Sequence, residues 1–363
     1  MILYFPLFVK KELPLGNGSV ARADNRCVQV DGLRGIAAIM VVLSHVHILD
    51  QGGVANAIFF AITGFLFINP YKNDYERKYL SPKNILKFYL NRALRILPFY
   101  YIVLIAVVLI TGFKVIPKEQ WIHNLYFTDW YDHLWYIHAL VRNYLIMPVV
   151  MMAFVFLSDR IRFLQNDIVR SLFFLVLGAL VRNEFIFLDI FDIRICQFMV
   201  GISAGYMFRY LLNNPALLKK IQDMRVAGNT LFISLFLAII LSSCNVTLLL
   251  FPDIYFRVGL VFPFFTSIFA AILLLAVVIY DKGTIGKLIG SRPLLFFGKI
   301  TLPLYLIHWF FLPVFRSFFN KYLTFVFALA VSSFLSWILD LLVSKVTGKL
   351  KSKKPADQKT ANA

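Results

Sequence analysis

Residues 31–49 read DGLRGIAAIMVVLSHVHIL, an apolar stretch close to the length of about 20 residues that a helix needs to cross a bilayer. Similar runs recur along the whole chain of 363 residues, of which 60% are hydrophobic and only 15% are Asp, Glu, Lys or Arg. A soluble domain carries about 25% charged residues. The composition therefore indicates that lipid surrounds most of this protein. It excludes a soluble enzyme, a disulfide-stapled secreted module and a disordered chain.

The apolar runs predict an all-α, polytopic membrane protein with about ten transmembrane helices. They are continuous, whereas strands of a membrane barrel alternate apolar and polar residues. The predicted spans are 32–49, 53–70, 93–112, 134–157, 168–181, 195–212, 228–250, 254–280, 301–319 and 323–343. The chain is thus divided into an N-terminal segment (1–31), a transmembrane domain (32–343) and a basic, disordered tail (344–363).

The basic residues orient these helices. The net charge is +18, and 28 of the 37 Lys and Arg residues fall in the N-terminal segment, in alternate loops with the adjoining span ends, and in the tail. The opposite loops with their span ends hold seven, and the interiors of the spans hold two, Arg34 and Arg142. Cytoplasmic segments of membrane proteins carry this excess, so both termini are predicted to be cytoplasmic. The same bias explains the positive charge without a nucleic-acid partner.

Arg34 and His45 are ionisable residues in the first predicted span, where such groups are costly and are functional candidates by default. Eleven positions separate them, which places them on nearly one helix face about 16 Å apart along the axis. Arg34 then lies at the cytoplasmic mouth and His45 towards the outer leaflet. The structural alternative is that Arg34 reaches lipid phosphates and His45 hydrogen-bonds a neighbouring helix.

Arg92 and Arg95 lie three positions apart, on one face at the cytoplasmic start of the third span. Two guanidinium groups in this arrangement suit a phosphate-bearing ligand. The alternative is that they are ordinary positive-inside charges that meet lipid headgroups.

Other spans carry polar or small residues of interest. His308 and Tyr305 lie in the ninth span, and Trp135 opens the fourth. Gly64 follows Thr63 in the second span, where a small residue permits close helix packing. Taken singly, each of these features is weak evidence for function.

Five stretches of the chain carry a family resemblance when they are taken together. They are DGLRGIAAIMVVLSHV (31–46), AITGFLF (61–67), NRALRILPFYY (91–101), HLWYIHALVRNYLIMP (133–148) and GKITLPLYLIH (298–308). In this order they resemble the membrane-bound acyltransferase-3 family, which O-acylates sugars of bacterial surface polysaccharides such as lipopolysaccharide and exopolysaccharide. The spacing of Arg34 and His45 matches the family's Arg-x10-His signature, and Arg92-x-x-Arg95 matches its paired-arginine motif.

The chain departs from the family pattern at two places. Thr63-Gly64-Phe65 stands where Ser-Gly-Phe is frequent, a change that keeps a hydroxyl group. Many members carry Trp-Ser-Leu-x-x-Glu in the fourth span, whereas residues 135–140 read WYIHAL and contain no acidic residue. We therefore predict no role for a glutamate of the fourth span as a partner of the reacting groups.

The resemblance implies an enzyme of the bacterial inner membrane that uses acyl-CoA, in the first place acetyl-CoA, as a donor substrate. The acceptor is a hydroxyl of a cell-surface sugar, polysaccharide or glycolipid, and no cofactor or metal is permanently bound. We expect Arg34, Arg92 and Arg95 to hold the donor's phosphates. His45 is the expected general base and His308 the second catalytic candidate.

The remaining candidates would support the substrate or the oxyanion of the tetrahedral intermediate. Thr63, Tyr305 and backbone amides near Gly64 are the expected donors, and Trp135 lies near the reacting groups. Direct transfer in a ternary complex is the first choice of mechanism, and an acyl-His45 intermediate stays open because imidazole can act as a nucleophile.

Two other classes of function use the same buried polar residues. A proton-coupled transporter or flippase of a glycan or lipid-linked precursor would place His45, His308 and Arg34 on a proton or substrate path. A cytochrome would use the two histidines as axial haem ligands. Cys27, Cys196 and Cys244 form no metal or disulfide pattern.

Overall fold

The computed structural model describes residues 27–49, 52–184, 194–241 and 262–352. Within these ranges the chain forms helices joined by turns and contains no β-strand, which confirms the predicted all-α class. The elements are α1 (Val28–His45), α2 (Gly52–Phe67), η1 (Tyr75–Leu80), α3 (Pro82–Thr111), α4 (Lys118–Tyr126), η2 (Asp132–Leu134), α5 (Trp135–Arg160), η3 (Arg162–Gln165), α6 (Asp167–Glu184), α7 (Arg194–Asn213), α8 (Pro215–Asp223), α9 (Arg225–Leu241), α12 (Phe262–Ile279), α13 (Thr284–Ile289), α14 (Arg292–Lys299), α15 (Thr301–Arg316) and α16 (Lys321–Ser352).

Several of these helices are long and apolar enough to cross a membrane. The described ranges contain five such segments, or up to six if α14 and α15, which meet at a bend of 78°, are counted as one broken span. The apolar helices Gly52–Phe67 and Phe264–Ile279 are shorter. The predicted spans 228–250 and 254–280 fall partly on residues 242–261, outside the described ranges. A multi-pass membrane protein is therefore supported, whereas the count of ten spans and the cytoplasmic termini stay predictions.

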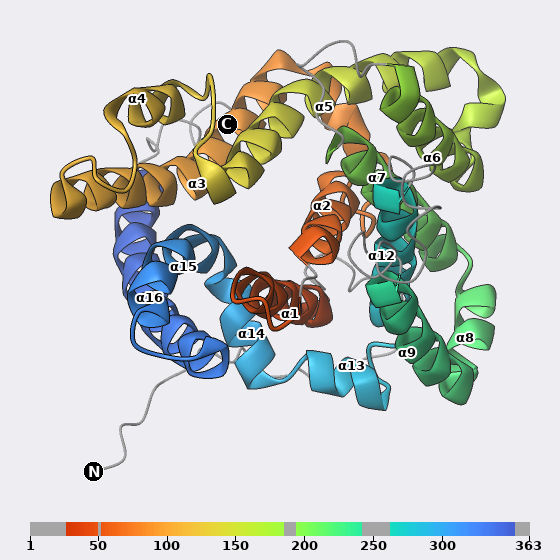
Figure 1. Cartoon of the computed structure of the whole chain (residues 1–363). Helices are drawn as coiled ribbons and strands as arrows, with labels where there is room; N and C mark the ends of the chain where they lie inside the picture. Colours follow the sequence, from red (N-terminus) through yellow and green to blue (C-terminus); the bar gives the residue numbers. More distant parts are fainter. Residues whose placement is uncertain (1–26, 50–51, 185–193, 242–261, 353–363) are drawn as a thin grey trace.

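Helices α1 and α2 occupy the centre of the assembly, with α3 and α5, α7 and α12, and α15 and α16 arranged around them (Figure 1). α2 packs along α7, and α1 packs along α14. Glycine makes both approaches possible: a Cβ at Gly64 would collide with the carbonyl oxygen of Phe198, and a Cβ at Gly35 with that of Leu294. The central position of α1 and α2 buries the faces that carry the sequence motifs.

Three helix ends differ from the predicted span boundaries. α1 ends at His45, and His47 just beyond it has a φ of 56°, which no right-handed helix accommodates. α3 begins at Pro82, well before the predicted start of its span at 93. α16 continues to Ser352, so the first part of the predicted disordered tail (344–363) is helical, and residues 353–363 lie outside the described ranges.

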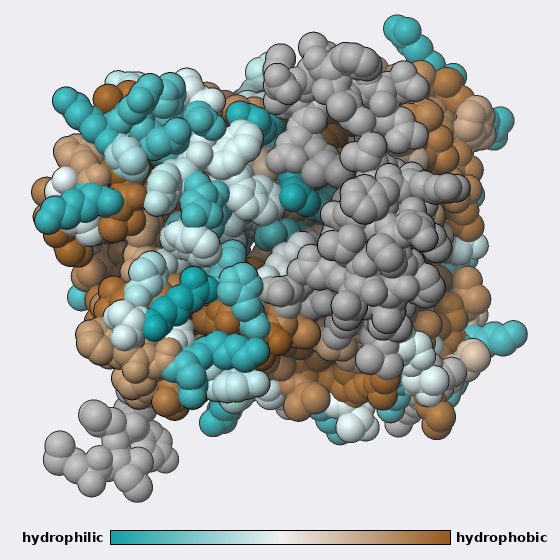
Figure 2. Space-filling model, in the orientation of Figure 1, coloured by the Kyte–Doolittle hydropathy of each residue, from teal (hydrophilic) through white to brown (hydrophobic). Residues whose placement is uncertain are grey.

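The outer surface has the hydropathy pattern of a protein that is surrounded by lipid. Apolar residues cover most of the right and lower edges of the molecule in Figure 2, while hydrophilic residues gather in the left half of the face turned to the viewer. Leu109 and Ile110, near the end of α3, are 80% and 83% exposed. Large exposed apolar areas mark interaction or membrane surfaces, and their place on a helix long enough to span favours the membrane.

Glu76 in η1 is the centre of a buried ion-pair network. Its carboxylate accepts hydrogen bonds from Arg170 at 2.9 Å and from two nitrogens of Arg209 at 2.7 and 2.9 Å, and Asp167 accepts another from Arg209 at 2.8 Å. Burial would raise the pKa of Glu76, but the hydrogen bonds and charge of Arg209, and then the charge of Arg170, hold it below its ordinary value. The network ties η1 to the start of α6 and to the last part of α7, and the distribution of basic residues predicts that these regions lie on the same side of the membrane.

Replacing Glu76 with Gln is expected to lower the free energy of unfolding by about 3–5 kcal/mol, because two buried arginines lose their central carboxylate. The native pKa lies below the ordinary 4.5, so this contribution is present at neutral pH and is lost as the pH falls through the native pKa. Denaturant unfolding in detergent, followed by tryptophan fluorescence, measures the effect. The exposed Glu119→Gln variant is the control and should stay within about 0.5 kcal/mol of the wild type; equal losses in both variants would contradict the assignment.

Candidate active site

A cavity of about 720 Å³ opens between α1, α2, η1, α3, α5, α14, α15 and α16. This volume lies within the range of small-molecule sites, about 300–1,000 Å³. Its basic lining residues are Arg34, Lys78, Lys87, Arg92, Arg95 and Lys299, and Asp340 is the acidic one among the described lining residues. Lys299 forms an ion pair with Asp340 at 3.1 Å. The excess of basic groups in a partly enclosed space favours an anionic ligand.

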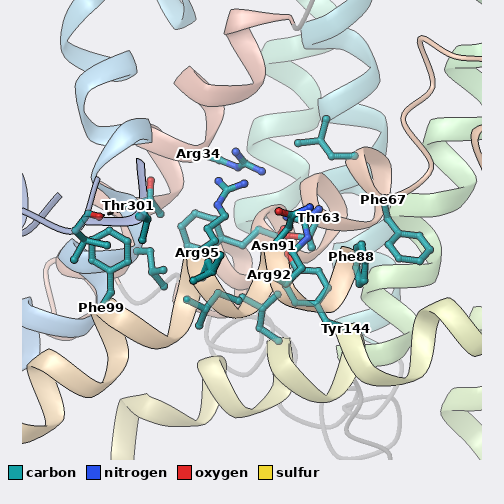
Figure 3. Close-up of a pocket in the computed structure, with 18 of the residues that line it drawn as sticks. Arg34, Thr63, Phe67, Phe88, Asn91, Arg92, Arg95, Phe99, Tyr144 and Thr301 are labelled. Atoms are coloured by element: carbon teal, nitrogen blue, oxygen red, sulfur yellow. Dashed lines mark hydrogen bonds between the residues drawn. The ribbon is translucent and has the colours of Figure 1, made fainter. Parts of the chain in front are cut away.

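All three arginines that were predicted to hold the donor line this cavity. Figure 3 shows the side chains of Arg34, from α1, and Arg95, from α3, extending towards one another across it. Arg34 forms an ion pair with Asp31 at 3.1 Å, and the Arg92 guanidinium lies 4.8 Å from the ring centroid of Tyr144. The structure thus brings the two arginine motifs of the sequence together in one cavity.

Lys78 in η1 also lines the cavity, although the sequence analysis did not single it out. Its Nζ lies 3.5 Å from the ring centroid of Tyr75 and 4.7 Å from that of Tyr79. Burial, and then the charges of Arg92 and Lys72, lower the pKa of Lys78 from 10.5 to about 7. Lys78 is therefore a basic group of the cavity whose charge changes near neutral pH.

The predicted support residues of the second span have local partners. Thr63 lines the cavity, and its hydroxyl donates to the carbonyl oxygen of Phe59 at 2.7 Å. Gly64 lies inside α2, where an interior amide N–H is used by the helix itself, and its missing side chain serves the contact with α7. An oxyanion role for Thr63 would thus require its hydroxyl to rotate, and the backbone of Gly64 contributes through packing.

Tyr305 lies at the wall of the cavity, whereas Trp135 is not among its described lining residues. The hydroxyl of Tyr305 donates to the carbonyl oxygen of His133 at 2.5 Å, so it too would have to rotate to serve an oxyanion. The guanidinium of Arg194 lies 4.5 Å from the ring centroid of Trp135. Tyr136, the residue after Trp135, does line the cavity, and its ring centroid is 4.8 Å from that of Tyr305.

His45 and His308 form a hydrogen-bonded pair that is not among the described lining residues of the cavity but contacts one of them, Tyr305, whose ring centroid is 5.9 Å from that of His308. Nδ1 of His45 lies 2.8 Å from Nε2 of His308, and the two rings stack at an angle of 19°. His308 follows Tyr305 by three positions, so it lies one turn further along α15. Arg316 donates to the backbone carbonyl of His45, and the Trp309 ring packs edge-on against the His45 ring at 4.8 Å between centroids. The structure thus joins two histidines that are 263 positions apart in the sequence.

Comparison with known proteins shows what the chain is related to. The family model described as an acyltransferase domain matches residues 28–341. The chain belongs to the acyltransferase-3 family. This acyltransferase-3 chain is also similar to the O-acetyltransferase OatA of Staphylococcus aureus. In strains NCTC 8325 / PS 47, COL and MRSA252 the identity is 24% over 322 residues, which covers 77% of this chain and 49% of the relative.

The acyltransferase-3 chain spans about half the length of the curated relatives that it matches. No solved structure matches it.

Two further residues of the acyltransferase-3 chain near the histidine pair were missed from the sequence. His133 falls between the predicted spans 93–112 and 134–157, yet it is buried, with its ring centroid 5.9 Å from that of His308. Tyr136 was passed over in favour of its neighbour Trp135. In both cases the motif HLWYIH marked the right segment, but only the three-dimensional packing shows which side chains turn inward.

Proposed function

We propose that this protein is an integral-membrane O-acyltransferase of the bacterial inner membrane. It moves an acyl group, in the first place acetyl, from cytoplasmic acetyl-CoA to a hydroxyl of a cell-surface sugar, polysaccharide or glycolipid. The observation that carries the proposal is a basic cavity whose wall at Tyr305 lies one helical turn from a hydrogen-bonded histidine pair, within an acyltransferase-3 domain. The likeness to a protein named O-acetyltransferase supports the choice of acetyl and of an oxygen acceptor.

The donor binds in the basic cavity with its phosphates on Arg34, Arg92 and Arg95. Guanidinium groups match phosphate oxygens in geometry and keep their charge at all relevant pH values. A phosphate-bearing donor does not cross lipid unaided, so the cavity serves the cytoplasmic side. The acyl end of the donor points towards Tyr305 and the histidine pair.

His45 starts the transfer by taking the proton of the acceptor hydroxyl as that oxygen attacks the thioester carbonyl. The tetrahedral intermediate then collapses, the C–S bond breaks, and the proton passes to the CoA thiolate, which leaves as the free thiol. A positioned general base contributes about 10²–10⁴-fold to such a reaction. Direct transfer needs no covalent enzyme; exchange of label between acetyl-CoA and CoA without an acceptor would indicate an acyl-His45 intermediate instead.

A transfer assay tests the function. Purified protein in detergent is given acetyl-CoA labelled in the acetyl group together with a cell-envelope glycan extract, and we expect label on the glycan in an alkali-labile ester. Acetyl-CoA labelled in the adenine ring is the matched control and should leave the glycan unlabelled. Glycan that stays unlabelled in the first reaction would reject the function.

The geometry disfavours the cytochrome alternative. A metal ion bound between two imidazole nitrogens needs about 4 Å between them, twice a metal–nitrogen bond, whereas His45 and His308 bond directly at 2.8 Å. None of the described contacts favours the transporter alternative over acyl transfer.

Lys78 makes donor binding depend on pH. Its pKa of about 7 means that it is cationic below neutral pH and loses its charge as the pH rises. We expect the Lys78→Met variant to raise the KM for acetyl-CoA up to about tenfold at pH 6.5, the value of one charge-assisted hydrogen bond, and to change it little at pH 8.5. Acetyl-CoA itself titrates with pH, but it does so equally for both proteins. The ratio of the variant's KM to the wild-type KM at each pH is therefore free of this effect. The exposed Lys83→Met variant is the control, and a ratio for Lys78→Met that is the same at both pH values would contradict the prediction.

A further inference from the structure

We propose that His308 is a positioning residue that fixes the tautomer of His45, so that the lone pair of His45 lies on Nε2. The inference rests on the proposed function, in which His45 takes the acceptor's proton. It assigns His308 a role in the reaction without contact to substrate and names the nitrogen of His45 that accepts the proton.

A chain of two hydrogen bonds carries the proposal. Nδ1 of His308 lies 3.0 Å from the backbone carbonyl oxygen of Leu304. A carbonyl oxygen only accepts, so this nitrogen of His308 carries the hydrogen. In a neutral ring the other nitrogen, Nε2, then has the lone pair, and it accepts from Nδ1–H of His45 at 2.8 Å. With its hydrogen on Nδ1, His45 has its own lone pair on Nε2.

The surroundings of His308 hold it in this state. Its side chain is fully buried, where an unpaired charge would be costly, so the ring of His308 is neutral. Leu304 lies four positions earlier on the same helix, and the bond to its carbonyl is therefore set by the fold of α15. Tyr305 and His133 pack against the ring of His308, each with its centroid at 5.9 Å. Rotation of His308 would break the chain of bonds and free His45 to adopt the other tautomer.

A wrong tautomer would present an N–H group where the reaction needs a lone pair. In hydrolases that use a histidine base, the residue that holds the ring's second nitrogen contributes in the same way, through tautomer and orientation. In this protein His308 is the residue that holds the second ring nitrogen of His45. It does so with a neutral imidazole, whose Nε2 accepts the hydrogen bond. The arrangement predicts that a side chain with an acceptor at the position of Nε2 can replace His308, whereas one with an acceptor at the position of Nδ1 cannot.

Two amide variants separate these cases. The amide of Gln reaches the position of Nε2 and its oxygen can accept from His45, while the shorter Asn reaches only the position of Nδ1. In the labelled acetyl transfer assay with the glycan extract, we expect His308→Asn to lower kcat by about 100-fold or more, with the KM for acetyl-CoA unchanged. We expect the kcat of His308→Gln to be at least about tenfold higher than that of His308→Asn. Thermal unfolding midpoints of both purified variants report whether each is folded.

Equal kcat values for the Gln and Asn variants, or a loss that appears in the KM for acetyl-CoA, would overturn the inference. If the Gln variant does not fold, the double variant His45→Ala/His308→Asn is compared with His45→Ala alone. A residue that acts only through His45 adds no further loss once His45 is gone, so a slower double variant also overturns it. If the wild type is active and the variants give these results, only the role of His308 is rejected. If the wild type labels no glycan, the proposed function is rejected, and the inference with it.

Discussion

The His45→Ala variant is expected to lose acetyl transfer by about 10²–10⁴-fold in kcat while it binds acetyl-CoA with an affinity close to that of the wild type. The loss equals the contribution of a positioned general base. Binding is preserved because Arg34 lies about 16 Å from His45 along α1, and Arg92 and Arg95 lie on another helix, α3. Initial rates of label transfer at saturating donor measure the first effect, and equilibrium binding of acetyl-CoA to the purified protein measures the second.

His47→Asn is the matched control for this variant. His47 lies two positions further on, has an exposed side chain and adopts a positive φ, which Asn tolerates better than most residues. It should keep full transfer. A His45→Ala protein that is folded and transfers at the wild-type rate would remove His45 as the base, and with it the mechanism proposed above.

The double variant Arg92→Ala/Arg95→Ala is expected to raise the KM for acetyl-CoA by about 100-fold or more. Each lost charge-assisted hydrogen bond costs about 1.5–3 kcal/mol, and 1.4 kcal/mol corresponds to a factor of ten. The value of kcat at saturating donor should change little, because these groups bind the end of the donor that does not react. Steady-state kinetics over a wide range of acetyl-CoA concentrations give both constants.

Two further variants sharpen this test. Arg92→Lys keeps the charge but loses the planar fork, so its KM should fall between those of the wild type and Arg92→Ala. Arg162→Ala removes an exposed arginine of η3, outside the described lining of the cavity, and should leave the KM unchanged. A KM for the double variant that matches the value for Arg162→Ala would show that the donor binds elsewhere.

The sequence predicted the helical class and the key pairs of residues because both depend on local spacing. Arg34 and His45 share one helix, α1, and Arg92 and Arg95 share another, α3. Periodicity of the helix places each pair on one face without knowledge of the rest of the fold. The placement of all three arginines in one cavity goes beyond this, and it was predicted only through the family resemblance.

The features that the sequence did not predict depend on contacts between distant segments. Glu76, Arg170 and Arg209 were each counted as loop charges or passed over, yet they form one buried network. Lys78 lies in a short helix between two spans, and its pKa is lowered by burial and then by the charges of Arg92 and Lys72. The charges of loop residues indicate on which side of the membrane a loop lies, but they do not show which of these residues are buried in the folded protein.

α1 is held near both ends, by the close approach of Gly298 in α14 to the backbone of Asp31 and by the bonds of His308 and Arg316 in α15 to His45. The ten residues between Arg34 and His45 therefore fix the distance and the relative orientation of these two side chains. Inserting a single residue there would advance one end by about 1.5 Å and turn it by about 100° relative to the other. Point substitutions at the half-buried positions of this segment should thus be tolerated far better than any change of its length.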